Sequence, residues 1–241
     1  MQKQVALVIG AGDALGGAIA RRFAKEGFVA AIVRRHGDKL APLVESIRGA
    51  GGAAEAFGVD ARKEELMSEL VALIERDLGP IEVAVFNIGA NVRFPIRETT
   101  ARVYFKVWEM GCFAGFLMGR EVAKVMVPRQ RGTILFTGAT ASLRGSAGFA
   151  AFAGAKHGLR ALAQSMAREL GPLGIHVAHT VIDGAIDTAF IRENFPERYA
   201  LKEQGGILDP DAIAENYWRL HQQPRSAWTH ELDLRPWIES W

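Results

Sequence analysis

The sequence of 241 residues lacks several features that would indicate particular classes of protein. Its one cysteine, Cys112, cannot form a disulfide within the chain, which fits a reducing, cytoplasmic setting. Lys and Arg (29) nearly balance Asp and Glu (27) without forming a basic run, so we expect no nucleic-acid partner. The apolar run at residues 5–9 is far shorter than the roughly 20 residues that cross a membrane, so we expect neither a targeting signal nor a membrane partner.

Length and a hydrophobic content of 49% favour one α/β domain spanning residues 1–241. Short apolar runs alternate with longer segments of helical spacing, which is typical of βαβ units and of a parallel sheet covered on both faces. The expected strands lie at residues 5–9, 29–33, 53–59, 83–87, 133–137, 175–182 and 228–234.

Proline and glycine mark the ends of several expected elements. Pro128 closes a helix at 107–127, and further helices are expected at 149–170 and 210–221. The helical pattern weakens between residues 185 and 209, where we expect a mobile flap over a substrate site. A C-terminal tail follows at 222–241.

The first chemical signal is the sequence GAGDALG at residues 10–16, directly after the first expected strand and before a helical run. Gly10 and Gly12 permit a tight turn, and Gly16 lets the helix pack closely with its N-terminus facing an anion. A purely structural turn is the alternative. Together with the alternation of strands and helices, the loop predicts a Rossmann-type doubly wound parallel sheet of about seven strands, with helices on both faces. Such a domain would hold NAD(P).

Further motifs in register resemble the short-chain dehydrogenase/reductase family from about residue 5 to about residue 188. The glycine loop resembles the family's TGxxxGxG with Ala14 at the middle glycine, and Phe86-Asn87-Ile88-Gly89 resembles its NNAG segment. Asp60 matches the family's adenine-contacting acid. The resemblance implies that the cofactor is contacted by Gly10, Gly12, Ala14, Leu15, Gly16, Asp60, Ala61, Asn87, Gly89, Lys156, Ile186 and Thr188, the last two from a segment similar to PGxIxT in which Asp183 replaces the proline.

The end of the second expected strand bears on the choice of cofactor. Members that use NAD carry an acid there for the ribose hydroxyls, whereas this chain has Arg34 and Arg35. Two guanidiniums can pair with a 2′-phosphate, so NADP(H) is favoured over NAD(H). Two solvated arginines are the alternative, and Asp13 in the neighbouring loop would repel a phosphate.

The catalytic residues that the family resemblance implies are mostly missing. The family uses S-x12-YxxxK with an asparagine on the preceding helix, in which the tyrosine donates a proton to the alkoxide left by hydride transfer. Lys156 matches the lysine, but the tyrosine position is Phe152, the serine position Ala139 and the asparagine position Gly111. Losing a positioned general acid costs roughly 10² to 10⁴ in rate, so the family's ordinary proton relay is not expected here.

Two hydroxyl groups lie close to the missing serine, on Thr140 and Ser142. With Lys156 they form a candidate relocated relay. The alternative is that both residues only stabilise a turn, since Ser and Thr side chains often hydrogen-bond to the nearby backbone after a strand.

We therefore expect an NAD(P)-binding oxidoreductase of a small carbonyl or alcohol with a non-standard or impaired proton relay. The alternative is a catalytically inactive NADP(H)-binding sensor or regulatory subunit that takes a small-molecule effector, and a scaffold without ligand ranks last. No metal site is expected, because His176 and His179 point to opposite faces of a strand. Family members are commonly homodimers or homotetramers; the aromatic C-terminal tail fits a subunit contact or an intramolecular cap.

Overall fold

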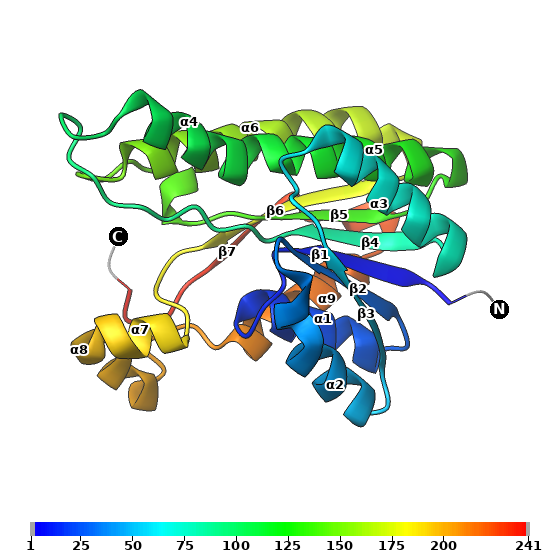
Figure 1. The fold of residues 1–241 in the computed structure, drawn as a ribbon, viewed down its shortest axis with the longest axis horizontal. Helices are drawn as coiled ribbons and strands as arrows, with labels where there is room; N and C mark the ends of the chain where they lie inside the picture. The colour runs from blue at the N-terminus through cyan, green and yellow to red at the C-terminus, as the bar shows by residue number, and fades with distance from the viewer. Residues whose placement is uncertain (1–2, 240–241) are drawn as a thin grey trace.

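The computed structural model describes residues 3–239 and contains one parallel sheet of seven strands in the order β3-β2-β1-β4-β5-β6-β7 (Figure 1). All six strand pairs run parallel, as a series of βα units requires. The strands are β1 Val5–Ile9, β2 Val29–Arg34, β3 Ala53–Gly58, β4 Ile81–Phe86, β5 Thr133–Thr137, β6 His176–Ile182 and β7 Glu231–Leu234.

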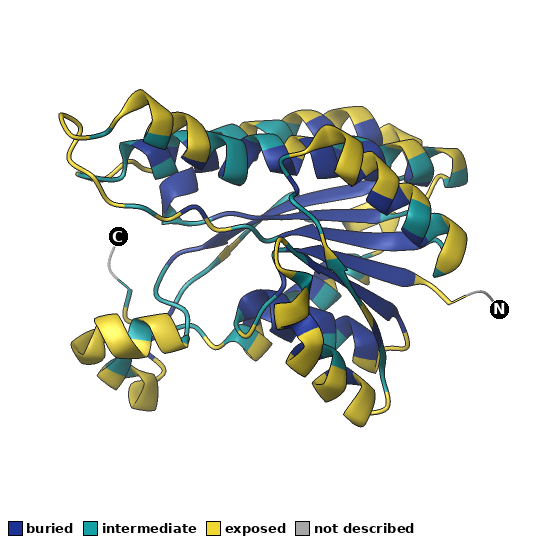
Figure 2. Cartoon of the chain, in the orientation of Figure 1, coloured by how far each residue is buried: buried dark blue, intermediate teal, exposed yellow. Residues whose placement is uncertain are grey.

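Helices cover both faces of the sheet and enclose two apolar cores. On one face lie α3 Glu64–Asp77, α5 Ala114–Met126 and α6 Ala150–Leu170, and on the other lie α1 Leu15–Lys25, α2 Ala41–Gly49 and α9 Pro210–His221. Strands β1, β4, β5 and β6 are buried along their whole length (Figure 2), as expected for a parallel sheet covered on both faces. The predicted doubly wound fold is confirmed.

Strands β1, β2 and β3 follow one another toward one edge of the sheet, whereas β4 pairs with the other side of β1 and begins the series toward the opposite edge. The strand order therefore reverses between β1 and β4. Chain segments leave the carboxyl ends of these neighbouring strands toward opposite faces, which opens a crevice at that edge. The glycine loop after β1 lies at this point. In sheets of this type, the reversal is where a ligand binds.

The helix expected at 107–127 is wrong in its details. Helix α4 starts earlier, at Ala101–Trp108, because the Thr100 hydroxyl accepts a hydrogen bond from the Val103 N–H and caps it. A π-helical turn at Glu109–Phe113 then joins α4 to α5. Pro128 lies within a 3₁₀ turn, Val127–Arg129, that follows α5 and closes this helical segment.

The segment expected to be a flap contains short helices instead of irregular chain. These are α7 Ala189–Asn194, α8 Pro196–Tyr199 and the 3₁₀ segment Ala200–Gln204, and most of their residues are exposed (Figure 2). Pro196 starts a helix because its missing N–H needs no partner in the first turn. The mobility and covering role predicted for residues 185–209 stay predictions.

The C-terminal tail packs against this segment. The Trp237 indole N–H donates to the Gln204 carbonyl at 2.9 Å, and Arg198 pairs with Glu239 at 2.8 Å. The last expected strand is shorter than predicted, because Trp228 stacks on His176 before β7 begins. Residues 240–241 of the predicted tail lie outside the described residues. In the part of the chain described, no helix is both long and apolar enough to cross a membrane.

Candidate active site

The glycine loop forms a tight turn after β1 that only glycine can make at two positions. Gly10 has a φ of +90°, and a Cβ atom there would lie 2.7 Å from the Asn87 carbonyl oxygen. A Cβ atom on Gly16 would lie 2.4 Å from the Gly10 carbonyl oxygen. Gly12 differs, since a Cβ there would have no atom within 4 Å among the described residues. At Gly10 and Gly16 the turn therefore has no room for a side chain, whereas at Gly12 it faces open space. A phosphate that approaches the backbone closely needs such an opening.

Helix α1 presents its N-terminus to this opening. Its cap residue is Ala14, and among the described residues no side chain caps the first turn. The Gly17 N–H already donates to the Ala14 carbonyl at 3.0 Å, so the N–H groups of Leu15 and Gly16 are the ones available to an external acceptor. The helix dipole favours an anion there. The Asn87 amide donates to the Gly10 carbonyl at 3.2 Å and holds the turn against β4.

A cleft of about 270 Å³ opens beside this turn, at the carboxyl ends of β1 to β4. The structure brings seven of the predicted cofactor residues together in its wall, which comprises Ile9, Gly10, Ala11, Val33, Arg34, Arg35, His36, Val59, Asp60, Ala61, Arg62, Asn87, Ile88, Gly89 and Met110. Gly12, Ala14, Leu15 and Gly16 lie in the adjoining turn and helix start. The glycine turn, the helix N-terminus and the adjoining cleft together fit a dinucleotide.

Ile186 and Thr188 lie apart from this wall, on the segment after β6. Ile186 forms an isolated parallel bridge with Leu208, and the Thr188 hydroxyl caps α7 by accepting from the Ile191 N–H at 3.2 Å. Both positions are thus fixed by local backbone contacts. Their predicted role at the nicotinamide end stays a prediction.

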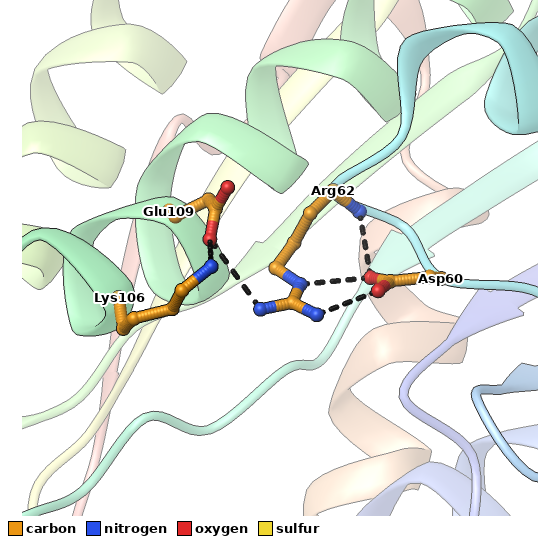
Figure 3. A network of polar contacts seen from close by, with 4 residues as sticks. All are labelled: Asp60, Arg62, Lys106 and Glu109. Atoms are coloured by element: carbon orange, nitrogen blue, oxygen red, sulfur yellow. Dashed lines mark hydrogen bonds and ion pairs between the residues drawn. The ribbon is translucent and has the colours of Figure 1, made fainter.

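Sequence reasoning missed Arg62, which lines the cleft and forms a polar network with Asp60, Glu109 and Lys106 (Figure 3). Arg62 donates to both Asp60 carboxylate oxygens, from Nε at 2.8 Å and from Nη2 at 2.6 Å. These bonds lower the pKa of Asp60 to about 2, so its carboxylate is ionised. The spacing Asp-x-Arg after an expected strand was the available signal.

Lys156 is buried on α6, where its ammonium faces the carboxyl ends of β4 and β5. Its Nζ donates to the Thr137 carbonyl at 2.9 Å and to the Ile88 carbonyl at 3.1 Å. Burial lowers its pKa to about 8, since desolvation penalises the charged form. The Phe152 ring, where the family has tyrosine, lies with its centroid 6.0 Å from the Lys156 ammonium. A cation is therefore held where the family's chemistry needs one, beside a ring without a proton to give.

The position of the family's asparagine is tightly packed. A Cβ atom on Gly111 would lie 3.1 Å from the Ala155 Cβ and 3.3 Å from the Ala90 Cβ. A side chain there would require these neighbours to shift by a few tenths of an ångström. Three residues of the family's tetrad are therefore replaced, and only the lysine is kept.

The two hydroxyl groups near Ala139 have different surroundings. The Thr140 hydroxyl donates to the buried Asp183 carboxylate at 2.5 Å, and Arg144 lies 3.6 Å from the same carboxylate oxygen. Ser142 is fully buried, and its hydroxyl oxygen accepts the Ala139 N–H at 3.1 Å. Of the two, only Thr140 is partly exposed and linked to a charged group. Among the residues described, no group of His, Cys, Asp and Glu side chains is arranged to hold a metal ion.

A sequence profile described as short chain dehydrogenase matches residues 4–198. The chain is 30% identical to the uncharacterized oxidoreductase YxjF of Bacillus subtilis over 82% of its own length and 76% of that protein. It is 51% identical to a solved short-chain dehydrogenase from Rhodopseudomonas palustris, covering 98% of this chain and all of the other, with a TM-score of 0.84. A metagenomic short-chain oxidoreductase solved in complex with NADP is 25% identical over 98% of both chains, with a TM-score of 0.83.

These similarities agree with the site built from the residues. The profile covers most of the chain, from the glycine loop through Lys156 to the segment after β6. The cleft, the open helix N-terminus and the buried lysine have the features that a site for a nicotinamide nucleotide requires. This protein therefore belongs to the short-chain dehydrogenase/reductase family of nicotinamide-nucleotide-binding oxidoreductases.

Proposed function

We propose that this protein is an NADP(H)-dependent oxidoreductase of a small carbonyl or alcohol, with a proton relay that does not use position 152. The observation that carries the proposal is the cationic end of the cleft. Arg34 ends β2, Arg35 follows it, and both line the cleft beside His36, where an NAD-specific member has an acid. Guanidinium groups recognise phosphate through charge-assisted hydrogen bonds, so this end suits the 2′-phosphate of NADP(H).

The position of Asp13 removes an objection to this proposal. Its side chain is exposed and lies outside the residues that line the cleft in the described part of the chain. Repulsion between a solvated carboxylate and a phosphate is weakened by water and salt. Two solved relatives, each 25% identical to this chain, add support: a metagenomic oxidoreductase in complex with NADP and an actinorhodin polyketide ketoreductase with NADPH.

When bound, the cofactor would supply or accept the hydride, and the chain's residues would handle charge and protons. Lys156 holds a positive charge against the carboxyl ends of β4 and β5, where it would stabilise an alkoxide. The Thr140 hydroxyl, bonded to Asp183, is the candidate proton relay. Ser142 serves this relay by fixing the loop through the Ala139 N–H.

The test is a fluorescence titration with NADPH and with NADH, followed in the same cuvette by a panel of small aldehydes and ketones. We expect NADPH to bind more tightly than NADH and to be oxidised when a suitable carbonyl is added. Binding of NADPH without oxidation by any compound, in either direction of the reaction, would favour the non-catalytic sensor. Binding of neither nucleotide would contradict the proposal as a whole.

A homo-oligomer is proposed as the working state, supported by a stack of aromatic rings on α4 and α5. Phe105, Trp108, Phe113 and Phe116 stack in sequence with centroids 5.8–6.1 Å apart, and Phe105 and Phe116 are exposed. Exposed aromatic groups of this kind gain from burial against another chain. Light scattering during size exclusion should give a dimer or tetramer, and a monomer at all concentrations would contradict this.

A further inference from the structure

The wall of the cleft contains one feature that opposes a 2′-phosphate. Asp60 is the only acid among the described residues that line the cleft, and it shares that wall with Arg34 and Arg35. An ionised carboxylate there would repel the phosphate and would compete with it for the guanidinium groups. Selectivity for NADP(H) therefore depends on what neutralises Asp60.

Arg62 occupies both oxygens of that carboxylate. Besides its two guanidinium bonds, the Arg62 backbone N–H donates to Asp60 Oδ1 at 3.2 Å. The Arg62 side chain is 17% exposed and that of Asp60 24%, so the pair is partly shielded from water. Three of the roughly four acceptor positions of the carboxylate are used by one residue, in a bidentate geometry that lysine cannot make.

A second contact fixes the guanidinium from the other side. Arg62 Nη1 lies 3.3 Å from Glu109 Oε2, and the same oxygen accepts from the Lys106 ammonium at 2.8 Å (Figure 3). Because Lys106 balances Glu109, the charge of Arg62 stays available to Asp60. Glu109 also belongs to the π-helical turn that supplies Met110 to the cleft wall. The network therefore holds Arg62 between the adenine end of the cleft and α4.

Arg35 is the residue that would replace Arg62 as the partner of Asp60. Its charge already acts on Asp60, since it contributes to the lowered pKa of that carboxyl. Arg35 is exposed and follows β2 directly, so its side chain can turn toward an unpaired carboxylate. If it did, the cleft would lose one of the two guanidiniums that suit the phosphate.

We propose that Arg62 determines the preference for NADP(H) by neutralising Asp60, which leaves Arg35 free for the 2′-phosphate. This inference rests on the proposed function, because it assumes that the cationic end of the cleft takes that phosphate. Arg62 is a positioning residue in this account, and it acts through Asp60 and Arg35. The 2′-phosphate is the one group that distinguishes the two nucleotides, so NADH binding should barely change when Arg62 is replaced.

The experiment measures the dissociation constants of NADPH and NADH by fluorescence, and of 2′,5′-ADP and 5′-AMP by calorimetry, for four proteins. Wild type is compared with Arg62→Met, with the double variant Asp60→Asn/Arg62→Met, and with Arg76→Met as the matched control. We expect Arg62→Met to weaken NADPH and 2′,5′-ADP about tenfold or more, and NADH and 5′-AMP less than about threefold. The double variant should recover most of the loss, because no carboxylate remains to attract Arg35.

Arg76 on α3 is exposed, pairs with the neighbouring Asp77 and does not line the cleft, so Arg76→Met should change all four constants less than about threefold. Thermal unfolding of each variant checks that the fold is kept. Equal weakening of NADPH and NADH by Arg62→Met, or a double variant as weak as the single one, would overturn the inference while leaving NADP(H) binding established. Failure of the wild type to bind either nucleotide would instead remove the proposed function.

Discussion

Three of the four positions of the family's catalytic pattern differ in this protein, and each of the three has lost a polar group. Ala139, Phe152 and Gly111 replace serine, tyrosine and asparagine, whereas Lys156 is kept. The lysine still has a task without the tyrosine, since it bonds the carbonyl groups of Ile88 and Thr137. The site therefore keeps the lysine cation of the family but lacks the tyrosine that donates the proton.

Restoring the hydroxyl groups should restore ordinary chemistry if the rest of the pocket is competent. In the double variant Ala139→Ser/Phe152→Tyr, NADPH-dependent reduction of a small ketone should rise roughly 100-fold over wild type, because a positioned general acid contributes about that much or more. Initial rates of NADPH oxidation measure it. Adding Lys156→Met should abolish the gain, since the lysine favours the tyrosinate. An unchanged rate in the double variant would indicate that the pocket geometry has diverged.

Lys156 should titrate well below an ordinary lysine. Its pKa of about 8, against the usual 10.5, makes the ammonium the main form at pH 7 and the neutral amine the main form at pH 9. The unfolded chain binds the extra proton between these two pKa values, so the free energy of unfolding should rise as the pH increases from 8 toward 10.5. Carbon-13 NMR of the lysine Cε groups, assigned with Lys156→Met, measures the midpoint. A midpoint above pH 10 would contradict the desolvation argument.

At the scale of elements, the loop between β5 and α6 depends on a close contact with β6. A Cβ atom on Gly138 would lie 2.3 Å from His179 Nε2 and 2.5 Å from its Cε1, and this ring is fully buried. The ring cannot move aside, because its Nδ1 is held 3.2 Å from Glu231 on β7. The glycine before Ala139 is therefore required by packing, and its backbone needs no unusual conformation.

Replacing this glycine should cost stability through overpacking. Gly138→Ala should lower the free energy of unfolding by about 1 to 3 kcal/mol, as small-to-large changes in packed interiors do. Denaturant unfolding followed by circular dichroism measures it. Gly145→Ala in the same loop is the matched control, since a Cβ there meets no described atom within 4 Å. Equal stability of the two variants would show that the loop relaxes around the added methyl group.

The buried histidines should make stability depend on pH. Desolvation by burial lowers the pKa of His179 to about 4, although Glu231 opposes the shift, whereas an unfolded histidine titrates near 6.5. The unfolded chain therefore binds more protons between these values, and the free energy of unfolding falls as the pH decreases from 6.5 toward 4. Between pH 7 and pH 5 this one residue should account for about 2 kcal/mol.

Denaturant unfolding at pH 7 and pH 5 tests this. In His179→Gln, the free energy of unfolding should fall less between these two pH values, because the contribution of His179 is gone. His221, whose pKa burial also lowers to about 4, keeps its own share in the variant. The matched control variant is His157→Gln, at an exposed position on α6. An unchanged pH dependence in His179→Gln would contradict the buried neutral state of that ring.

At the scale of the whole molecule, the segment of α7 and α8 and the C-terminal tail hold each other. The tail after β7 bonds the segment of α7 and α8 through Trp237 and Glu239, and Pro236 packs where a Cβ of Gly184 would lie. Figure 1 shows these helices standing apart from the layers that cover the sheet. Their order therefore depends on the tail more than on the core.

Weakening the tail should loosen this segment alone. In Trp237→Ala, backbone amides of residues 200–206 should exchange with deuterium faster by about tenfold, while those of β1 to β6 keep their rates, because the lost bond stabilises only local structure. Exchange followed by mass spectrometry of peptides measures it. The exposed Phe105→Ala on α4 is the control. Uniform acceleration across the sheet would show that the tail instead supports the whole fold.

The sequence by itself determined the layers of the fold and the place of the cleft beside the glycine loop. Apolar runs of strand length, separated by helical spacing, allow few arrangements other than a parallel sheet with helices on both faces, and the six long-range strand pairs followed that pattern. Gly10 and Gly16 could be recognised because a backbone requirement selects one residue type. Lys156 could be recognised through its spacing from Phe152.

Only the tertiary structure decided which charges and hydroxyl groups act together. The bonds from Thr140 to Asp183, from Arg62 to Glu109 and from His179 to Glu231 join residues 43 to 52 positions apart. The burial of Ser142 and the start of α4 at Ala101 were likewise invisible in the pattern. The physical reason is that polar pairing and burial depend on distances set by packing, whereas periodicity and glycine requirements are local properties of the chain.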